Sequence, residues 1–580
     1  MNNINENRPD PKKIEKELGE FLNKKFGGNV KIISPSMLPQ EAPIHGKEKK
    51  SGKKDLINFD IRPRELISYL DQYIVKQDRA KTVLATKICT HLNRIKLSDV
   101  NSEYEGTITG NIKSNILMLG PTGVGKTYLI KLIAKKIGIP FVKADATKFS
   151  ETGYVGGDIE DLVRDLVKEA DEDIELAQCG IIYIDEIDKI AASNHFRGSD
   201  ISRAGVQRAL LKPMEDTDVD LKVPHDPVSM MQELERFQRT GKRSKKRVNT
   251  ANILFIVSGA FSDLTDIISR RVTTQAMGFG ATLSKSSKKG DLLRQLKAED
   301  LVNFGFESEF IGRLPVRCFL DEMSRDDLFQ ILRMPNNPVI LGKRLDFSAY
   351  GIHILFTSEA LEIFADQAFK ENSGARGIVS VVENTLIPFE KELPSSTISN
   401  FTVTRKVVEN PEAELADILS GKSIEKWDLR YNETWKAEKH YITEYIRKHW
   451  KNLSIRHGLT LSRERSRLVA DYFCTHVTEL GKAIKKIKSY YESVKKIEID
   501  FFNHHDLNIV FEEDAVDFLI EQFINNSITQ DELMAKLYND FYDGLHLVHK
   551  KTEKNRFFLS RQSLIDHEIF LNDLIRKEIS

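Results

Sequence analysis

Short apolar runs alternate with amphipathic segments between about residues 59 and 320. Four of these runs read as buried strands, and a helical pattern follows each of the first three. The runs are NILMLG (115–120), PFVKAD (140–145), GIIYID (180–185) and NILFIVSG (252–259). Apolar strands that alternate with helices are typical of a parallel sheet covered on both faces. The spacing therefore predicts an α/β fold for this region.

The pattern becomes mainly helical from about residue 346 to 410, and residues 426–500 are predicted to form two helices. The second of these helices carries an apolar seam with spacings of three and four residues, at Val477, Leu480, Ile484, Ile487, Tyr491 and Val494. The seam is short for a coiled coil, so a pair of packed helices is the favoured interpretation.

The end of the chain shows internal sequence similarity to an earlier segment. Residues 351–369 align with 506–524 at an offset of 155, and residues 401–415 align loosely with 557–571. We therefore hypothesise a degenerate second copy of the small helical domain. The alternative is chance similarity between amphipathic helices.

These patterns divide the chain into five parts. They are an N-terminal helix with a flexible linker (1–57), a large α/β domain (58–325), a small, mainly helical domain (326–415), a helical pair (416–500) and the degenerate copy (501–580).

Composition narrows the possible functions. The 580 residues include 86 Lys and Arg and 86 Asp and Glu, and this balance argues against a nucleic-acid partner. The four cysteines form no C-x-x-C pair, which argues against a zinc ribbon or a disulfide framework. There is no leader-like apolar segment at the N-terminus and no run of 18 apolar residues, so we expect a cytoplasmic protein without membrane contact.

A phosphate-binding pattern follows the first predicted strand. The sequence GPTGVGKT (120–127) satisfies G-x-x-x-x-G-K-[ST] and opens a helix, so its backbone N–H groups can surround phosphate oxygens. Lys126 is expected to reach the β/γ-phosphates of ATP, and Thr127 to bind Mg²⁺. The alternative is a Gly-rich turn without a ligand. The predicted nucleotide-binding residues here are Gly120, Pro121, Thr122, Gly123, Val124, Gly125, Lys126, Thr127 and Tyr128.

The predicted strand IIYID (181–185) ends in carboxylates. Asp185 is expected to hold Mg²⁺ together with Thr127, and Glu186 to polarise the attacking water. The alternative is a solvated acidic turn. Asp188 is assigned a structural role, and Ser258, at the end of another strand, is a weaker candidate for orienting the same water.

Further motifs support a family resemblance. They are LDQYIVKQDRAKTVLA (70–85), GYVGGDIEDLV (153–163), MGFGAT (277–282), FESEFIGRLPV (306–316) and SGARGIVSVVE (373–383). With the phosphate loop, they make residues 60–410 resemble the AAA+ ATPases of the Clp/HslU group, in particular its ClpX-like members. The resemblance implies a P-loop NTPase large domain (parallel sheet between helices) and a small α+β lid domain. A mainly helical C-terminal extension would follow them.

The resemblance also implies roles for residues outside the phosphate loop. Tyr73, Ile74 and Val75 would line the adenine pocket. Arg313 would be an arginine finger in the neighbouring subunit's site, and Arg376 a phosphate-contacting arginine from the small domain. Guanidinium groups suit both roles because they stay charged and form forked contacts with phosphate. A surface salt bridge is the alternative for either arginine.

Two further segments are expected to act directly on protein substrates or on a peptidase partner. By resemblance, Tyr154 and Val155 project into the pore of a homohexamer and grip unfolded or tagged proteins. Met277, Gly278 and Phe279 stand where ClpX-like proteins dock a ClpP-like peptidase. The basic run KRSKKR (242–247) either attracts acidic tags or is a solvated charged segment.

The chain also departs from the family pattern. It lacks the cysteine pairs of the usual N-terminal zinc-binding domain, and Lys76 replaces the usual Gly. Gln530 and Asp531 fall near the position of Arg376 in the degenerate copy, which is therefore expected to bind no nucleotide. The function predicted is an ATP-dependent protein unfoldase and translocase that delivers substrates to a peptidase. The alternatives are a protease-independent remodelling chaperone whose extension binds a dedicated partner, and a nucleic-acid motor.

Overall fold

The computed structural model describes residues 57, 59–100, 113–149, 158–191, 200–221, 247–276, 289–420 and 424–579. Within them, five strands form one parallel sheet in the order β2-β3-β6-β1-β7. They are β1 (Ile116–Leu119), β2 (Phe141–Asp145), β3 (Ile181–Asp185), β6 (Leu254–Gly259) and β7 (Val316–Phe319). The four predicted strands are therefore confirmed, and β7 adds an edge strand that the apolar runs do not predict.

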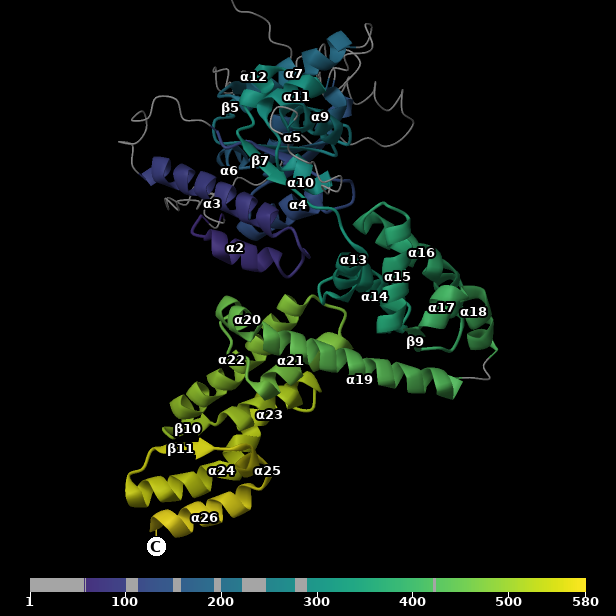
Figure 1. Cartoon of the computed structure of the whole chain (residues 1–580). Helices are drawn as coiled ribbons and strands as arrows, with labels where there is room; N and C mark the ends of the chain where they lie inside the picture. The colour runs from purple at the N-terminus through teal and green to yellow at the C-terminus, as the bar shows by residue number, and fades with distance from the viewer. Residues whose placement is uncertain are drawn as a thin grey trace, which may run out of the picture. The chain divides into compact units, whose positions relative to one another are not determined.

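Helices cover both faces of this sheet (Figure 1). Ile116 and Met118 of β1 lie in one apolar core, whereas Leu117 and Leu119 point into the core on the opposite face. The first core is closed by α2 (Pro63–Leu70), α3 (Asp78–Val100) and α4 (Lys126–Ile137). The second contains residues of α5 (Glu160–Glu169), α6 (Ile174–Gln178), α7 (Asp200–Met214), α9 (Leu264–Ala276), α10 (Lys289–Leu293), α11 (Ala298–Phe304) and α12 (Ser308–Gly312). The predicted α/β fold with a covered parallel sheet is confirmed.

Short elements connect the strands of the large domain. A 3-10 turn follows β2 and another follows β3, and a small antiparallel pair precedes β6. These elements are η4 (Ala146–Lys148), η5 (Ile187–Ile190), β4 (Asp218–Asp220) and β5 (Arg247–Asn249). The turn η5 begins directly after the acidic end of β3, so it fixes the direction of the chain at that point.

The small domain packs helices around a two-stranded parallel sheet, in which His353 lies opposite Asn400. Its elements are α13 (Arg325–Arg333), α14 (Pro338–Ser348), β8 (His353–Phe356), α15 (Ser358–Lys370), α16 (Ala375–Glu392), η6 (Leu393–Ser395), β9 (Asn400–Val403), α17 (Arg405–Glu409) and α18 (Pro411–Leu419). These elements share one apolar core, which includes Phe364, Phe389 and Phe401.

The prediction of a helical pair over 416–500 is wrong, because the described residues from 424 to 505 form four helices. They are α19 (Ile424–Lys448), α20 (Trp450–His457), α21 (Arg463–Thr475) and α22 (Leu480–His505). The apolar seam of α22 packs against other elements of its own region instead of one partner helix, since Ile484, Ile487 and Val494 share a core with α21, α23 and α24. None of the described helices is apolar over a length that would span a membrane.

The C-terminal elements repeat the order found in the small domain. After α22 come β10 (Asn508–Phe511), α23 (Glu513–Ile524), α24 (Gln530–Thr552), β11 (Arg556–Leu559), α25 (Arg561–Ile565) and α26 (His567–Ile579). The strands β10 and β11 are also parallel, with Asn508 opposite Arg556. The two alignment offsets seen in the sequence superpose β10 on β8 and β11 on β9. This agreement supports the hypothesis of a degenerate copy. Since α21 and α22 correspond to α13 and α14, the candidate copy starts near residue 462 instead of 501.

Candidate functional site

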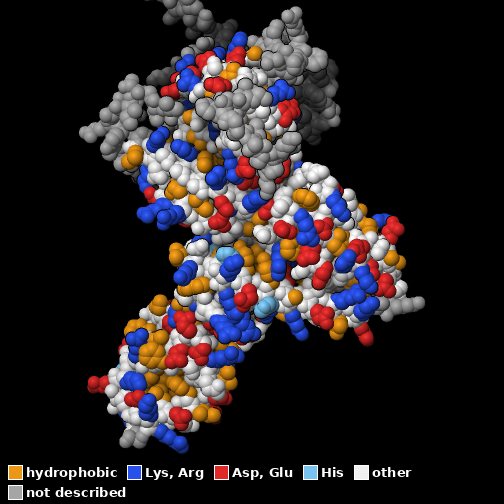
Figure 2. Space-filling view, viewed as in Figure 1, with side chains coloured by type: hydrophobic (Ala, Val, Ile, Leu, Met, Phe, Trp, Pro, Cys, Tyr) orange, Lys and Arg blue, Asp and Glu red, His pale blue; other side chains and the backbone are white. Residues whose placement is uncertain are grey.

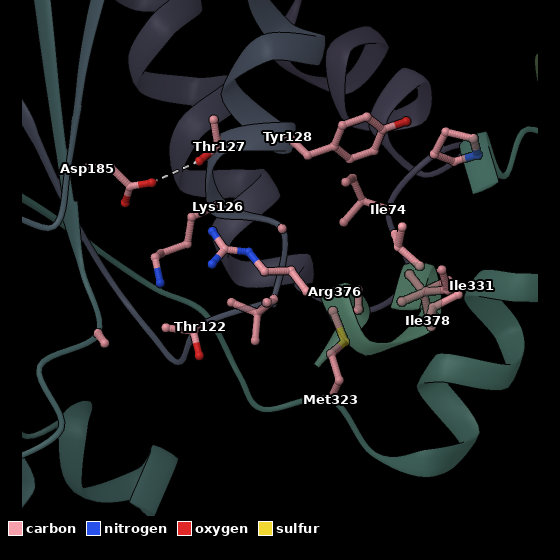
Figure 3. Close-up of a pocket in the computed structure, with 18 of the residues that line it drawn as sticks. Ile74, Thr122, Lys126, Thr127, Tyr128, Asp185, Met323, Ile331, Arg376 and Ile378 are labelled. Atoms are coloured by element: carbon pink, nitrogen blue, oxygen red, sulfur yellow. Dashed lines mark hydrogen bonds between the residues drawn. The ribbon is translucent and has the colours of Figure 1, made fainter. Parts of the chain in front are cut away.

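A pocket of about 510 Å³ lies between the large and the small domain (Figure 3). The large domain contributes the phosphate loop from Thr122 to Tyr128 and the segment from Tyr73 to Val75. The small domain contributes the start of α16, including Arg376, and apolar side chains such as Ile331. Residues that are far apart in the sequence thus enclose one space, with polar groups at one end and apolar groups at the other.

The phosphate loop adopts the tight conformation that its glycines predict. Gly123 and Gly125 have φ values of 74° and 90°, which strongly favour glycine. A Cβ atom on Gly123 would lie 2.0 Å from the carbonyl oxygen of Ser373 in the small domain. The loop therefore depends on glycine both for its turn and for its contact with the second domain.

The Lys126 ammonium is buried inside this loop. It donates hydrogen bonds to the carbonyl oxygens of Gly120, at 2.7 Å, and Pro121, at 2.8 Å. Burial lowers the pKa of Lys126, although the nearby carboxylates of Asp185 and Asp188 oppose this effect. The side chain is held at the loop, where a phosphate group can replace the carbonyl oxygens as its partner.

Asp185 ends β3 beside the first turn of α4. Its Oδ2 lies 3.2 Å from the Thr127 hydroxyl, and its Oδ1 accepts a hydrogen bond of 2.6 Å from Ser258. Burial acts to raise the pKa of Asp185, but the Ser258 hydrogen bond and the Lys143 ammonium outweigh it, so the net pKa is lowered. The group is therefore an anion. Such a carboxylate beside a threonine hydroxyl supplies the hard oxygen ligands that Mg²⁺ prefers.

Glu186 directly follows this carboxylate and is exposed. Its φ is 56°, so the chain turns sharply and separates the direction of Glu186 from that of Asp185. Asp188 instead accepts a hydrogen bond from the backbone N–H of Phe261, at 3.3 Å. Ser258 is fully buried and forms hydrogen bonds with Asp185 and Tyr183, so it supports the carboxylate and does not line the pocket.

The apolar end of the pocket contains Tyr73, Ile74, Val75 and Tyr128. The next residue, Lys76, has a φ of 59°, a left-handed conformation that explains why glycine suits this position. Its ammonium binds Asp327 of the small domain at 2.8 Å. The lysine thus keeps the turn and adds a link between the two domains.

The two predicted arginines lie in different places. Arg376 stands in the first turn of α16 and its guanidinium points toward Lys126 (Figure 3). Arg313 ends α12, is half exposed and forms an ion pair with Glu215 of the same chain, away from this pocket. Within one chain the structure therefore brings Arg376, but not Arg313, to the phosphate end.

Three predicted segments fall outside the described residues. They are the pair Tyr154 and Val155, the basic run 242–247 except for Arg247, which begins β5, and Met277, Gly278 and Phe279.

Several pocket residues have no local motif that would identify them. The apolar wall is formed by Met323, in the link before α13, and by Ile331, Met334 and Val339 from separate turns of the small domain. Their only sequence signal is the helical period of the small domain, which equally predicts core residues. Lys143 was also missed, although its position on β2 beside β3 places it 3.4 Å from Asp185.

Residues 111–317 match a family described as AAA domain (Cdc48 subfamily). The chain is also similar to proteins described as the ATP-dependent Clp protease ATP-binding subunit ClpX. The protein from Treponema denticola is 38% identical over 364 residues, which span 61% of this chain and 84% of that protein. The protein from Borrelia duttonii is 38% identical over 374 residues, which span 63% of this chain and 82% of that protein.

Proposed function

Because the chain belongs to the ClpX family of AAA+ ATPases, we propose that it hydrolyses ATP to unfold and translocate protein substrates. The relatives are named as ATP-binding subunits of the Clp protease, which favours delivery to a peptidase over a protease-independent chaperone. Figure 2 shows acidic and basic side chains interspersed on the visible face, and this gives no support to a nucleic-acid motor. The observation that carries the proposal is one pocket that the phosphate loop and Tyr73 of the large domain line together with Arg376 and apolar side chains of the small domain.

ATP binding is assigned to the two ends of this pocket. Lys126 and the backbone N–H groups of the loop bind the phosphates, while Tyr73, Ile74 and Val75 pack against the adenine ring. Arg376 adds a second cation from the small domain. One nucleotide can therefore hold the two domains together, because each binds part of it.

Magnesium fits the phosphate end of the site. Thr127 and Asp185 would hold the ion, since their oxygens lie side by side and the carboxylate is ionised. A bound magnesium ion supplies charge neutralisation to the phosphates.

Hydrolysis needs a base and a further cation. Glu186 is proposed to orient a water molecule and accept its proton, because it is exposed, follows Asp185 in the chain and lines the pocket. Arg313 is proposed to enter the site of the adjacent subunit in a homohexamer, and its half-exposed position leaves it accessible to a neighbour. Breaking its ion pair with Glu215 would free it for that role.

Substrate handling is proposed to follow from motion between the domains. A change of nucleotide alters the contacts that join the domains across the pocket, and the Tyr154–Val155 pair would transmit this motion to a threaded polypeptide. Met277, Gly278 and Phe279 would dock the ring to a ClpP-like peptidase.

Replacement of the proposed base tests this function. We expect Glu186→Gln to retain ATP binding and to lower the ATPase rate by roughly a hundredfold or more, because no carboxylate remains to accept the proton. Glu169→Gln, which changes an exposed carboxylate on α5, is the matched control and should behave as wild type. Normal turnover by Glu186→Gln would contradict the assignment.

Unfolding should be measured separately from hydrolysis. A stable fluorescent protein with a peptide tag should lose its fluorescence in the presence of ATP, and Tyr154→Ala should slow that loss while it retains the basal ATPase. With a ClpP-like peptidase added, Phe279→Ala should abolish degradation but not unfolding. Unfolding at the wild-type rate by Tyr154→Ala would contradict the pore-loop role.

A further inference from the structure

The beginning of α22 contacts both domains that enclose the nucleotide pocket. The Glu479 carboxylate accepts a hydrogen bond of 3.4 Å from the Tyr73 hydroxyl of the large domain. The backbone N–H of the next residue, Leu480, donates a hydrogen bond of 2.9 Å to the side-chain oxygen of Asn336 in the small domain. Two consecutive residues of the C-terminal extension thus reach opposite sides of the pocket.

Both contacted residues belong to the walls of the pocket or adjoin them. Tyr73 lines it directly. Asn336 lies in the turn between α13 and α14, where Met334 and Asn337 line the pocket. Asn337 also caps α14, accepting hydrogen bonds from the backbone N–H groups of Val339 and Ile340. A shift of this turn would therefore move part of the apolar wall.

The same region of the extension makes further contacts on each side. Arg456 of α20 lies over the ring of Tyr69, with 4.6 Å between the guanidinium carbon and the ring centroid, and Tyr69 in turn packs against Tyr73 at 5.0 Å. On the small-domain side, Arg344 of α14 forms an ion pair of 2.8 Å with Glu438 of α19. The contacts at Glu479 and Leu480 are therefore part of a wider attachment to both domains.

The two central contacts differ in strength. The bond between Leu480 and Asn336 is short and buried, so its loss would leave a buried N–H group without a partner. The bond between Tyr73 and Glu479 is long and its carboxylate is one-third exposed, so it contributes less. Burial raises the pKa of Tyr73, and the Glu479 charge adds to this effect, so the hydroxyl stays protonated as a donor. The extension thus has a firm anchor on the small domain and an adjustable contact with the adenine side.

We propose that Glu479 and Leu480 are positioning residues through which the C-terminal extension sets the affinity of the pocket for adenine nucleotides. They hold Tyr73 and Asn336 at the separation that a bound nucleotide requires, and neither residue touches the nucleotide. This inference rests on the proposed function, because it requires that the pocket binds ATP.

A double-mutant cycle in the full-length chain tests the hydrogen bond between Tyr73 and Glu479. The probe is a fluorescent ADP analogue, and its Kd is measured together with kcat and KM for ATP. Tyr73→Phe removes only the hydroxyl, and Glu479→Ala removes the acceptor. We expect each single variant to raise the Kd about threefold, and the double variant to be no worse than either, because both remove the same bond. For Glu479→Ala, which lies outside the pocket, KM should rise in parallel with the Kd, while kcat at saturating ATP stays within about twofold of wild type.

Two further variants separate positioning from general damage. Glu479→Gln keeps an acceptor oxygen and should restore most of the affinity. Glu464→Ala on α21, whose partner Arg467 is equally exposed, is the control and should leave the Kd unchanged. Asn336→Asp retains the acceptor oxygen for Leu480 and should change the Kd less than Asn336→Ala does. Asn336→Ala should raise the Kd while the protein still unfolds in a cooperative transition.

The outcomes distinguish the two proposals. If the wild-type chain fails to bind the ADP analogue, the proposed function is wrong. If it binds, the positioning role is wrong when Tyr73→Phe and Glu479→Ala leave the Kd unchanged, or when their effects on the Kd multiply in the double variant. The proposed function stands in either case.

Discussion

The small domain and the C-terminal region share an order of elements but use the corresponding helix ends differently. In the small domain, α16 starts at Gly374 without a side-chain cap, and the N–H of Ala375 donates a hydrogen bond of 2.8 Å to Gly123 in the phosphate loop. In the C-terminal region, α24 starts at Thr529, which forms a reciprocal capping box with Glu532. The start of α16 takes a hydrogen-bond partner from another domain, whereas the start of α24 is capped by side chains of its own segment.

This difference indicates how one scaffold can serve two purposes. The first N–H groups of a helix need partners, and whatever supplies them fixes what the helix end can do. The start of α16 takes a partner from the phosphate loop and brings Arg376 into the pocket with it. The start of α24 has an internal partner and carries Asp531 at the position equivalent to Arg376. The C-terminal region is therefore suited to structural support.

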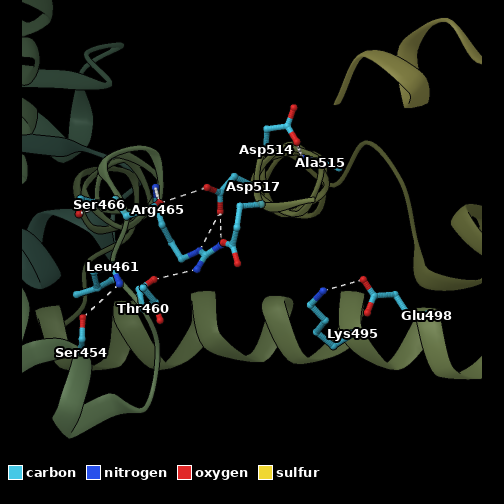
Figure 4. Close-up of polar contacts among 12 residues, drawn as sticks. Ser454, Thr460, Leu461, Arg465, Ser466, Lys495, Glu498, Asp514, Ala515 and Asp517 are labelled. Carbon is cyan, nitrogen blue, oxygen red and sulfur yellow. Dashed lines mark hydrogen bonds and ion pairs between the residues drawn. The ribbon is translucent and has the colours of Figure 1, made fainter. Parts of the chain in front are cut away.

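The two regions also differ in how an arginine joins the first helix to the helix after the first strand. Arg325 of α13 pairs with Asp366 of α15, and both side chains are 42% exposed. Arg465 of α21 pairs with Asp517 of α23 at 2.8 Å, and these side chains are only 1% and 11% exposed (Figure 4). Arg465 also donates to the carbonyl oxygen of Thr460, at 2.9 Å. The buried ion pair therefore lies in the C-terminal region, and the exposed one lies in the small domain.

The largest effect is expected when this buried pair is broken. Arg465→Ala should lower the free energy of unfolding of the C-terminal region by about 3–5 kcal/mol, because the Asp517 carboxylate then stays buried without its cation. Arg325→Ala is the matched change in the small domain and should barely alter the unfolding midpoint, since solvent screens the exposed pair. Urea unfolding monitored by circular dichroism measures both.

A double replacement sharpens this prediction. Arg465→Met combined with Asp517→Leu removes both charges and should restore much of the lost stability. Equal destabilisation by Arg465→Ala and Arg325→Ala would show that burial does not distinguish the two pairs.

The next largest effect concerns the position at which the copies differ in charge. Arg376→Ala should lower the ATPase rate by roughly a hundredfold, because a cation that meets the phosphates is lost. Asp531→Ala changes the equivalent position of α24 and should leave the rate unchanged, since this residue faces no part of the pocket. Steady-state phosphate release measures both variants. A strong effect of Asp531→Ala would contradict the view that the second copy is structural.

The sequence predicts these regions unequally for physical reasons. The phosphate loop and the end of β3 are recognisable because their chemistry depends on consecutive residues, such as Gly125, Lys126 and Thr127. The apolar wall from Met323 to Val339 depends on how the small domain closes over the large one, and no local pattern encodes that closure. The strand β7 is also missed, because its sequence VRCF is only four residues long, contains Arg317 and lies at the edge of the sheet, so it forms no apolar run.

The C-terminal region shows the same limit. Its strands are located by an offset alignment, since β10 and β11 lie where β8 and β9 predict them. The sequence predicts two helices where four lie before β10, because an apolar period does not reveal which partner a face packs against. The apolar seam of α22 is as compatible with a pair of packed helices as with the observed core, in which α22 contacts α21, α23 and α24.

The smallest effect expected comes from the residues that begin α16 and α24. Gly374 has φ 61° and ψ −142°, a conformation almost restricted to glycine, and an added Cβ would lie 2.9 Å from the carbonyl oxygen of Gly123. Gly374→Ala should therefore push the small domain away from the phosphate loop and raise the Kd for ATP about tenfold, the result of a cost of between 1 and 2 kcal/mol. Thr529→Ala removes the side-chain cap of α24 and should lower stability by about 1 kcal/mol without a change in the Kd. Equilibrium binding and urea unfolding of both variants measure the contrast. If Thr529→Ala weakened nucleotide binding as much as Gly374→Ala, the two helix ends would be coupled to the pocket alike, and the division of roles between the copies would fail.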